Sequence, residues 1–376
     1  MLRQNKMFGL ALVAGLLAVI CLSGLRAEDS SVKKTTKAKT ATKVIKDAED
    51  ERPVDEAGKD ATARFKVPDG GAKELLAFIL ENMKFSPKSQ QEAIQFRSKG
   101  MPAMREAGQK LQQIATDEDK KLEGYDDVIG YLLYLRAAEP QRAGAEPKTL
   151  FDDVKAYLAS HEIPSQYVIM AASQIARGLE FGGNPEQAAN AYRDLGGILA
   201  RNQDEKIAKT GAKMEGAARR MELLGHDMKV TGTEMDGTKF DWAKYRGKVV
   251  LVDFWATWCG PCLADLPNVK KNYELYHDKG FEVVGISVDR DREALEKFLE
   301  NEQNPWITLH DGDWSDNDVA TYYGVMGIPT VILVDKDGKV VSLRARGPEL
   351  GKQLAKLLGP ADTNPEDKKT DEDAAK

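Results

Sequence analysis

Cys259 and Cys262 are the residues of this sequence whose type and spacing are best suited to chemistry. The apolar run Val249–Trp255 predicts a buried strand that leads into the turn Cys259-Gly260-Pro261-Cys262, where a helix is expected to begin. The start of a helix presents unpaired N–H groups and a partial positive charge, which stabilise a thiolate. Two intervening residues let the second thiol reach the first and resolve a mixed disulfide. The pattern therefore predicts thiol–disulfide exchange.

Other uses of this cysteine pair fit the sequence less well. The chain of 376 residues has 3 cysteines, and Cys21 lies in an apolar N-terminal run. A disulfide across so short a loop would constrain little of the unfolded chain, which argues against a structural role. A zinc site normally needs four protein ligands, and no second Cys or His pair accompanies this one. A haem attachment site would have His after the second cysteine, where Leu263 stands.

The first residues have the pattern of an export signal. Arg3 and Lys6 precede the uncharged run Met7–Leu25, and the small Ala27 comes before acidic residues. This arrangement is typical of a secretory signal peptide, here residues 1–27. The run is also nearly long enough to span a bilayer, so the alternative is an uncleaved membrane anchor formed by residues 7–25. With either interpretation we expect the protein in the periplasm or cell envelope.

Two further segments are predicted to be disordered. Residues 28–68 and 360–376 are rich in Lys, Ala, Thr, Asp and Glu and have almost no large apolar side chains. Such segments cannot bury enough apolar surface to offset their conformational entropy, so we interpret them as a linker and a tail. The net charge of −6, with acids and lysines interspersed, offers no basic face for nucleic acid.

Residues 69–227 predict an all-α domain, because apolar residues recur at three- and four-residue spacing. Ser86–Pro87 and Asn184–Pro185 each have the pattern of an N-cap followed by proline in the first helical turn. The stretch 165–202 predicts a helical hairpin whose second half loosely resembles a tetratricopeptide repeat. One such unit is too few for a stable repeat array, so a helical bundle is the favoured interpretation and true repeats are the alternative.

Residues 228–359 predict an α/β domain after this all-α region. Val, Ile, Phe, Trp and Gly increase there, and short apolar runs alternate with helical stretches, which indicates a mixed or parallel sheet flanked by helices. The predicted strands are Val249–Trp255, Phe281–Val288, Thr330–Val334 and Lys339–Arg344. The predicted helices run from Cys262 to about Tyr276, over Asp291–Glu300 and over Pro348–Leu358. Asp236-Gly237 predicts the turn of a hairpin.

Several motifs in this region resemble the thioredoxin superfamily. Trp258-Cys259-Gly260-Pro261-Cys262 follows the apolar strand, and Asp253 lies six residues before Cys259, where thioredoxins keep a buried carboxylate. Gly327-Ile328-Pro329-Thr330 matches the cis-proline loop of that family. Thr233–Lys248 resembles the hairpin and lead-in strand of its TlpA/ResA type and of the wider redoxins. The resemblance covers about residues 230–358 and predicts a thioredoxin-like fold there.

The resemblance also implies a role for each residue of the site. Cys259 would be the exposed nucleophile and Cys262 the more buried resolving thiol. Asp253 would have a pKa raised by burial and would accept the proton of Cys262. Pro329, in cis, would expose neighbouring backbone to the extended chain of a substrate, and Trp258 would shield the pair. Thioredoxins often pair the buried acid with a lysine on the next strand, and the strand predicted here has none.

The expected activity is the reduction of disulfides in proteins of the cell envelope, without a cofactor or a metal. The Gly-Pro dipeptide between the cysteines is the thioredoxin version, which favours reduction. A membrane electron donor would supply the electrons, because that compartment is oxidising. In one alternative, the helical domain is an adaptor and the redox domain acts only on its docked partner. In another, the protein is a thiol peroxidase, although Thr257 is two residues before Cys259 rather than three.

Overall fold

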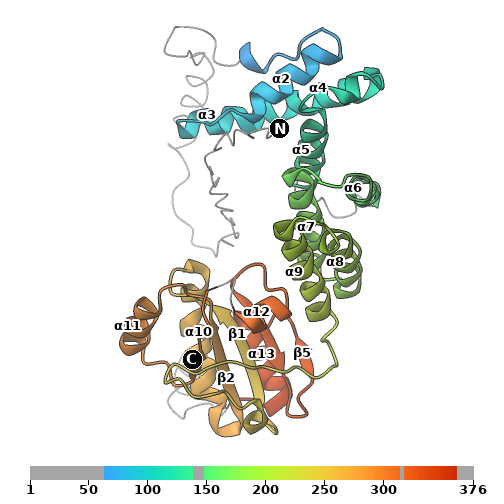
Figure 1. Cartoon of the computed structure of the whole chain (residues 1–376). Coiled ribbons are helices and arrows are strands. Elements are labelled where there is room, and N and C mark those ends of the chain that lie inside the picture. Colours follow the sequence, from blue (N-terminus) through green and yellow to red (C-terminus); the bar gives the residue numbers. More distant parts are fainter. Residues whose placement is uncertain (1–62, 139–147, 314–316, 362–376) are drawn as a thin grey trace, which may run out of the picture. The chain divides into compact units, whose positions relative to one another are not determined.

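The computed structural model describes residues 63–138, 148–313 and 317–361 (Figure 1). The predicted leader 1–27, with its apolar span 7–25, lies outside the described residues, as do most of the predicted linker and tail. The described residues from Arg64 onward belong to one compact unit. None of the helices in these ranges is both long and apolar enough to cross a membrane. The predicted domain boundaries at 69, 228 and 360 stay predictions.

The first part of this unit is helical, as predicted. Its α-helices are α2 (Ala72–Met83), α3 (Gln90–Gln95), α4 (Met101–Ile114), α5 (Tyr125–Ala137), α6 (Lys148–Ser160), α7 (Gln166–Phe181), α8 (Pro185–Ala200) and α9 (Glu205–Met221). Apolar side chains of α2, α4 and α5 form one core, and those of α5 to α9 form a second. Helices α7 and α8 pack together, which confirms the helical hairpin. The Asn184 side chain caps α8 by accepting a hydrogen bond from the Gln187 N–H at 3.0 Å.

The predicted helix start at Ser86–Pro87 is wrong, because α3 begins a few residues later. Ser89 is its N-cap, and the Ser89 Oγ accepts a hydrogen bond from the Glu92 N–H at 3.1 Å. The Glu92 carboxylate in turn accepts from the Lys88 N–H at 2.6 Å. A serine three residues before a glutamate satisfies two free N–H groups at once, and this outweighs the proline signal.

Regular structure begins inside the segment predicted as a linker. Ala63–Phe65 forms a 3₁₀ turn, and the Phe65 side chain is buried. The ring centroid of Phe65 lies 6.1 Å from that of Phe85 and 6.0 Å from that of Phe96. An aromatic ring gains enough from burial to order the residues beside it, even at the end of a polar segment.

The second part of the unit is the predicted thioredoxin-like α/β fold. Its strands are β1 (Val249–Trp255), β2 (Phe281–Ser287), β3 (Ile307–Leu309), β4 (Thr330–Val334) and β5 (Val340–Ser342). Its α-helices are α10 (Gly260–Tyr276), α11 (Arg292–Glu302), α12 (Asp318–Tyr322) and α13 (Pro348–Leu358). They form one mixed sheet in the order β3-β2-β1-β4-β5, in which β1, β2 and β3 are parallel and β4 is antiparallel to β1 and β5.

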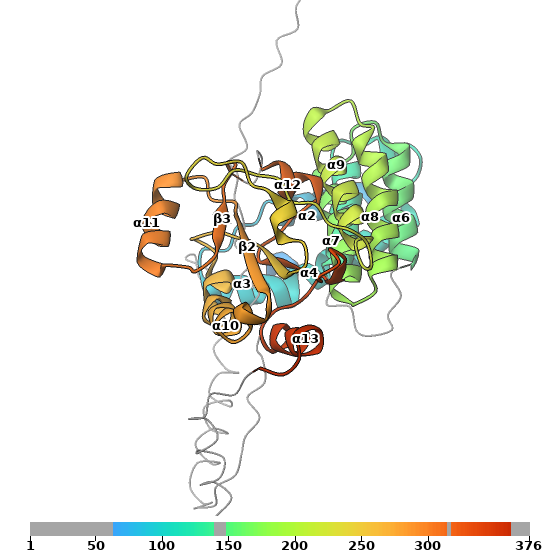
Figure 2. The same cartoon turned by 90° about the horizontal axis from the view of Figure 1, so that it is seen from below.

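Helices cover both faces of this sheet (Figure 2). Along β1, Val250, Val252 and Phe254 point to the core shared with α11 and α12, whereas Val249 and Leu251 point to the core shared with α10 and α13. Successive side chains of a strand point to opposite faces, so a central strand covered on both sides must be apolar nearly throughout. This explains why the apolar run, broken only by Asp253, was a reliable signal for β1.

Two elements of this fold are too short to be predicted from the sequence. Strand β3 has three residues at the edge of the sheet, and α12 is little more than one turn, so neither shows a periodic pattern. Four predicted elements also have different limits: β2 ends one residue earlier than predicted, and α11 is shifted by one to two residues. Helix α10 begins at Gly260, two residues before the prediction, and β5 ends at Ser342, where the prediction extended to Arg344.

Helix α9 packs closely on the loop that follows α12. A side chain at Gly216 of α9 would approach the Gly324 N atom within 2.6 Å, so the two backbones meet without room for a Cβ. Beside this contact, the Arg220 Nε donates to the Tyr323 carbonyl oxygen at 3.2 Å. Arg220 is also paired with Glu180 of α7, with 2.7 Å between nitrogen and oxygen. These contacts join the helical region to the α/β region.

A substitution at Gly324 tests this packing. Gly324 has φ +53°, and an added Cβ would overlap the backbone of Lys213 and Ala217. We expect Gly324→Ala to lower the free energy of unfolding by about 3 kcal/mol or more, because overpacking adds to the cost of the left-handed conformation. Gly225→Ala is the matched control, since Gly225 has φ +77° but nothing within 4 Å of the added Cβ. Denaturant unfolding of the full chain should show a loss of about 1–2 kcal/mol for the control. Equal losses for the two variants would contradict the close contact.

Candidate functional site

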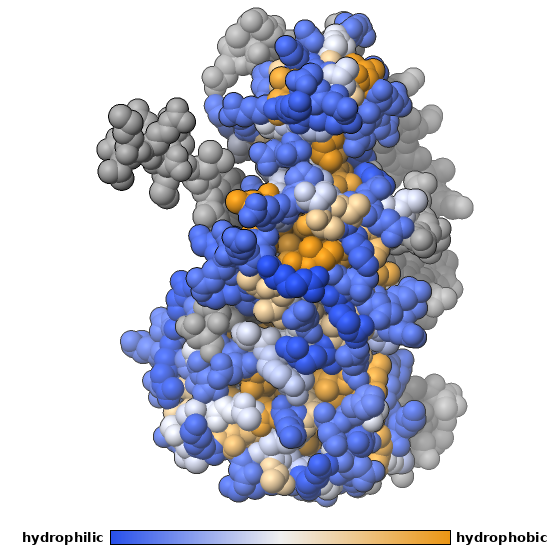
Figure 3. Space-filling view, turned by 45° about the vertical axis from the view of Figure 1, so that its right-hand side comes forward, coloured by the Kyte–Doolittle hydropathy of each residue, from blue (hydrophilic) through white to orange (hydrophobic). Residues whose placement is uncertain are grey.

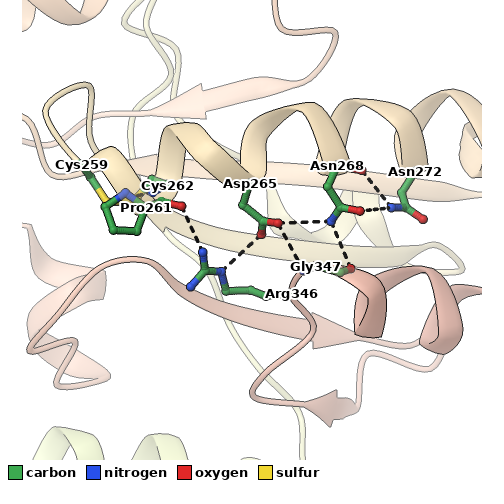
Figure 4. Close-up of polar contacts among 8 residues, drawn as sticks. All are labelled: Cys259, Pro261, Cys262, Asp265, Asn268, Asn272, Arg346 and Gly347. Atoms are coloured by element: carbon green, nitrogen blue, oxygen red, sulfur yellow. Dashed lines mark hydrogen bonds and ion pairs between the residues drawn. A yellow bond between two sulfur atoms is a disulfide. The ribbon is translucent and has the colours of Figure 1, made fainter. Parts of the chain in front are cut away.

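The cysteine pair lies where β1 ends and α10 begins (Figure 4). Cys259 and Cys262 form a disulfide, with 2.04 Å between the sulfur atoms and 5.2 Å between the Cα atoms. Cys259 is the N-cap of α10, and its Sγ accepts from the Cys262 N–H at 3.2 Å. Pro261 occupies the first turn, where its missing N–H leaves no hydrogen bond unmade. Both sulfurs therefore lie at the positive end of the helix dipole.

The exposure of the two cysteines differs from the prediction. Cys259 is 4% exposed and Cys262 is 7% exposed, so Cys259 is not the more accessible residue in this oxidised state. The disulfide draws the Cys259 side chain over the first turn of the helix, where its sulfur also accepts a hydrogen bond. Trp258, directly before the pair, is 64% exposed, and its shielding role stays a prediction.

A buried carboxylate that the sequence analysis missed holds the turn before Cys259. Asp289 is 2% exposed and lies two residues after the end of β2. Its oxygens accept from the Thr257 N–H at 3.0 Å, the Thr257 Oγ1 at 2.6 Å and the Ser287 Oγ at 2.8 Å. A buried carboxylate must have such donors, and here they fix the backbone two residues before the nucleophile candidate.

Asp253 lies on β1 with its side chain on the face covered by α10. Strand alternation places it beside Leu251 on that face, and its Oδ1 is buried with no hydrogen-bond partner in the described part of the chain. Burial, together with the negative charge of Asp265, raises the pKa of Asp253 to about 7, although Arg346 acts in the opposite direction. This agrees with the predicted rise. The carboxyl group can therefore hold or release a proton near neutral pH.

Asp265 is a second acid of the site that the sequence analysis did not identify. It lies three residues after Cys262 on α10, and Figure 4 shows it between the helix and the segment before α13. Its carboxylate accepts from the Arg346 Nε at 3.3 Å and the Gly347 N–H at 3.2 Å. Arg346 also donates to the Pro261 carbonyl oxygen at 3.1 Å. The sequence did offer one signal for Asp265. It lies three residues after a candidate cysteine on a predicted helix, and residues at that spacing share one face.

The cis-proline loop is present as the resemblance implies. The peptide bond between Ile328 and Pro329 is cis, and β4 begins at the next residue. Thr330 pairs with Phe254 near the end of β1, so the loop lies beside the strand that leads to the cysteines. Ile328 packs against the core cluster that contains both cysteines. The structure thus brings Asp253, both cysteines and the cis-proline loop to one end of the sheet.

Comparison with known proteins agrees with the thioredoxin-like fold described above. Residues 222–356 match the family model described as Redoxin. The thiol-disulfide oxidoreductase ResA of Bacillus thuringiensis subsp. konkukian is 31% identical over 126 residues, which are 34% of this chain and 70% of that protein. The chain belongs to the ResA-like thiol-disulfide oxidoreductases of the thioredoxin superfamily. The ResA of Geobacillus thermodenitrificans is 33% identical over 108 residues, covering 29% of this chain and 60% of that protein.

Solved structures include similar chains. The thioredoxin domain of a thiol-disulfide oxidoreductase from Bacteroides vulgatus is 33% identical, with coverage of 36% of this chain and 97% of that chain and a TM-score of 0.34. A thiol:disulfide interchange protein from Bacteroides sp. is 33% identical, with coverage of 37% and 93% and a TM-score of 0.34. The match to the Redoxin family and to the ResA relatives lies in the C-terminal α/β region, so this ResA-like enzyme carries its helical region in addition.

The buried carboxyl group of this ResA-like enzyme should make its stability depend on pH. Below an ordinary carboxyl pKa of about 3.9, Asp253 is protonated in both the folded and unfolded states. As the pH rises to about 7, the unfolded chain loses this proton first, so stability falls by roughly 4 kcal/mol at most. Asp253→Asn removes that loss. Denaturant unfolding of the oxidised protein at pH 4 and at pH 8 should show that the variant is more stable relative to the wild type at pH 8 than at pH 4.

The control for this measurement is Asp278→Asn, at an exposed position of the α/β region. It should change the free energy of unfolding by less than about 0.5 kcal/mol at either pH. If Asp253→Asn shifts stability equally at both pH values, the carboxyl group does not have the raised pKa.

Proposed function

We propose that this protein is an exported enzyme that reduces disulfides of envelope proteins with Cys259 and Cys262 as its redox pair. Its membership of the ResA-like thiol-disulfide oxidoreductases supports the reaction class. The observation that carries the assignment to these residues is the position of both sulfurs at the N-terminus of α10, above a strand that bears a carboxyl group with a pKa of about 7. A helix N-terminus stabilises the attacking thiolate, and the carboxyl group can take the second proton.

The reaction begins from the reduced dithiol. The Cys259 thiolate attacks one sulfur of the substrate disulfide, forms a mixed disulfide and displaces the other substrate sulfur as a thiolate, which takes up a proton. Cys262 then loses its proton and attacks the Cys259 sulfur. This forms the enzyme disulfide, breaks the mixed disulfide and releases the second substrate thiol. Two electrons pass from the enzyme to the substrate, and the oxidised pair is the state that the structure contains.

The acid on β1 supplies the proton acceptor for the second step. Asp253 lies on the α10 side of the sheet, and its pKa of about 7 makes it a base of suitable strength near neutral pH. Asp265 and Arg346 adjust that pKa in opposite directions, so the ion pair between them tunes the acid. Pro329 and its loop leave backbone beside the pair for the extended chain of a substrate.

The catalytic cycle needs a source of two electrons. The periplasm is oxidising, so a membrane-bound dithiol carrier is the donor that can return the Cys259–Cys262 disulfide to the dithiol. The Gly-Pro dipeptide between the cysteines, which is the thioredoxin version, supports the direction of reduction.

Equilibrium with glutathione buffers tests the direction of the reaction. We expect the pair to have a redox potential near that of thioredoxin, about −270 mV, in a Cys21→Ala background that leaves only this pair to titrate. A potential near the DsbA value of about −120 mV would contradict the reductase proposal and indicate an oxidase. The variant Cys262→Ser should accumulate a mixed disulfide with substrate, and Cys259→Ser should form none. Accumulation in both variants would contradict the assigned order of attack.

The N-terminus of the mature protein tests export. The cationic start, apolar run and small residue before the acidic segment support cleavage close to Ala27. Mass spectrometry of the protein recovered from an envelope fraction should therefore find a chain that begins near residue 28. An intact N-terminus in the membrane fraction would indicate the uncleaved anchor of residues 7–25. An intact chain in the cytosolic fraction would contradict export.

A further inference from the structure

A pocket of about 450 Å³ lies between the end of α7 and the cis-proline loop. Arg177 and Phe181 of α7 contribute to one side, and Ile328 and Pro329 contribute to the other. The segment between β5 and α13 adds Arg344 and Arg346. The helical region and the α/β region therefore build this pocket together.

The lining of this pocket carries more positive than negative charge. Arg220 also lines it, but this guanidinium is buried and paired with Glu180, at 2.7 Å and 3.3 Å. The Tyr192 hydroxyl donates to the same carboxylate at 2.7 Å. Burial opposes ionisation of Glu180, but the charge and hydrogen bonds of Arg220 lower its pKa below the usual value, so it stays an anion. One acid and one base of the lining thus cancel each other.

Arg177 and Arg344 have no close acidic partner of their own, although the positive charge of Arg177 also acts on Glu180. Both are exposed, and neither forms an ion pair with any carboxylate of the described residues. Arg344 donates to the Glu180 carbonyl oxygen, which fixes its position but leaves its charge. The Arg177 guanidinium lies 5.9 Å from the centre of the Phe181 ring and 3.6 Å from the place where a Cβ on Gly327 would lie. Two exposed guanidinium groups therefore line the pocket.

Apolar side chains complete the lining. Phe181 is 69% exposed, which is unusual for a ring of this size. Figure 3 shows hydrophobic patches among hydrophilic residues on one face of the molecule. The large hydrophobic side chains most exposed in the described ranges are Ile94, Ile114, Ile163, Met170, Phe181, Leu224, Trp258 and Tyr322. Phe181 is the member of this set that lines the pocket, where Met326 and Leu343 add apolar surface.

The pocket adjoins the redox pair through Arg346. This residue lines the pocket and donates to the carbonyl oxygen of Pro261, which stands between the two cysteines. Pro329, which also lines the pocket, precedes β4 beside the end of β1. A chain held in the pocket would thus continue directly to the cysteines.

We propose that this pocket binds an acidic, extended segment of the substrate protein next to the substrate cysteine. Carboxylate side chains of that segment pair with Arg177 and Arg344, and an apolar side chain packs on Phe181 and Ile328. Guanidinium groups suit this role because they bind carboxylates through two parallel hydrogen bonds. The inference rests on the proposed function, since it names the substrate class of the same redox pair. It gives the helical region a part in substrate selection.

The test uses two disulfide-containing peptides that differ only in charge. In one, glutamates precede a cysteine, and in the other, glutamines occupy the same positions. We expect the full chain in its reduced form to have a kcat/KM about tenfold higher for the acidic peptide, an advantage that decreases with added salt. Arg177→Gln combined with Arg344→Gln should bring this ratio close to one, whereas the corresponding pair of lysine substitutions should keep most of it.

The matched control combines Arg97→Gln with Arg201→Gln, which removes the same net charge from exposed positions outside the pocket. It should keep the wild-type preference. An equal loss in the control, or no preference in the wild type, would overturn the inference. Reduction of the small neutral 2-hydroxyethyl disulfide separates this failure from failure of the proposed function, because that compound needs the redox pair alone.

Binding without chemistry gives an independent readout. Fluorescence anisotropy should show the acidic peptide, with serine in place of its cysteines, binding the full chain more tightly than the glutamine peptide. The Arg177→Gln and Arg344→Gln pair should abolish that difference. Equal binding of both peptides by the wild type would contradict the pocket assignment even if no disulfide is reduced.

Discussion

The junction between a buried strand and a helix positions nearly every group of the site. β1 is hydrogen-bonded to neighbours on both sides and covered on both faces, so its end is held in place. Asp289 accepts the N–H and the hydroxyl of Thr257 in the turn that follows, and Cys259 then caps α10. The sulfurs of Cys259 and Cys262 gain their electrostatic environment from this geometry, because the free N–H groups at the start of a helix point toward the groups that the preceding turn places there.

The same junction determines the acid–base properties of the site. A strand that is buried on both faces places Asp253 in an apolar environment, and desolvation disfavours its charged form. Arg346 lies close enough to oppose this effect, but it is also paired with Asp265 and bonded to the turn between the cysteines. The arginine thus couples the acid on the strand to the helix that carries the sulfurs. A change at any one of these groups should be felt by the others.

Close backbone contacts and a buried arginine join the helical region to the α/β region, so the two regions are held tightly together at that point. Gly216 and Gly324 bring two backbones together, and the buried Arg220 bonds to both α7 and the loop after α12. Removal of either partner from a buried ion pair leaves an uncompensated charge, so this arrangement resists separation. It also holds the end of α7 beside the cis-proline loop, where the proposed substrate pocket is formed.

The sequence by itself determined the local features of this protein. An apolar run broken only by Asp253 predicted β1 within its observed limits, and the Cys-Gly-Pro-Cys turn predicted the start of α10 within two residues, because each depends on neighbours in the chain. The family resemblance added the cis conformation of Pro329 and the raised pKa of Asp253, and the structure has both.

Only the tertiary structure decided which distant groups meet. Thr257 and Asp289 are 32 residues apart, Asp265 and Arg346 are 81 apart, and Glu180 and Arg344 are 164 apart. No periodicity or motif links such pairs, since a charged residue on a predicted surface has the same local signal whether or not it finds a partner. The packing of sheet, helices and loops brings them into contact, and with them the environment of the redox pair and the pocket beside it.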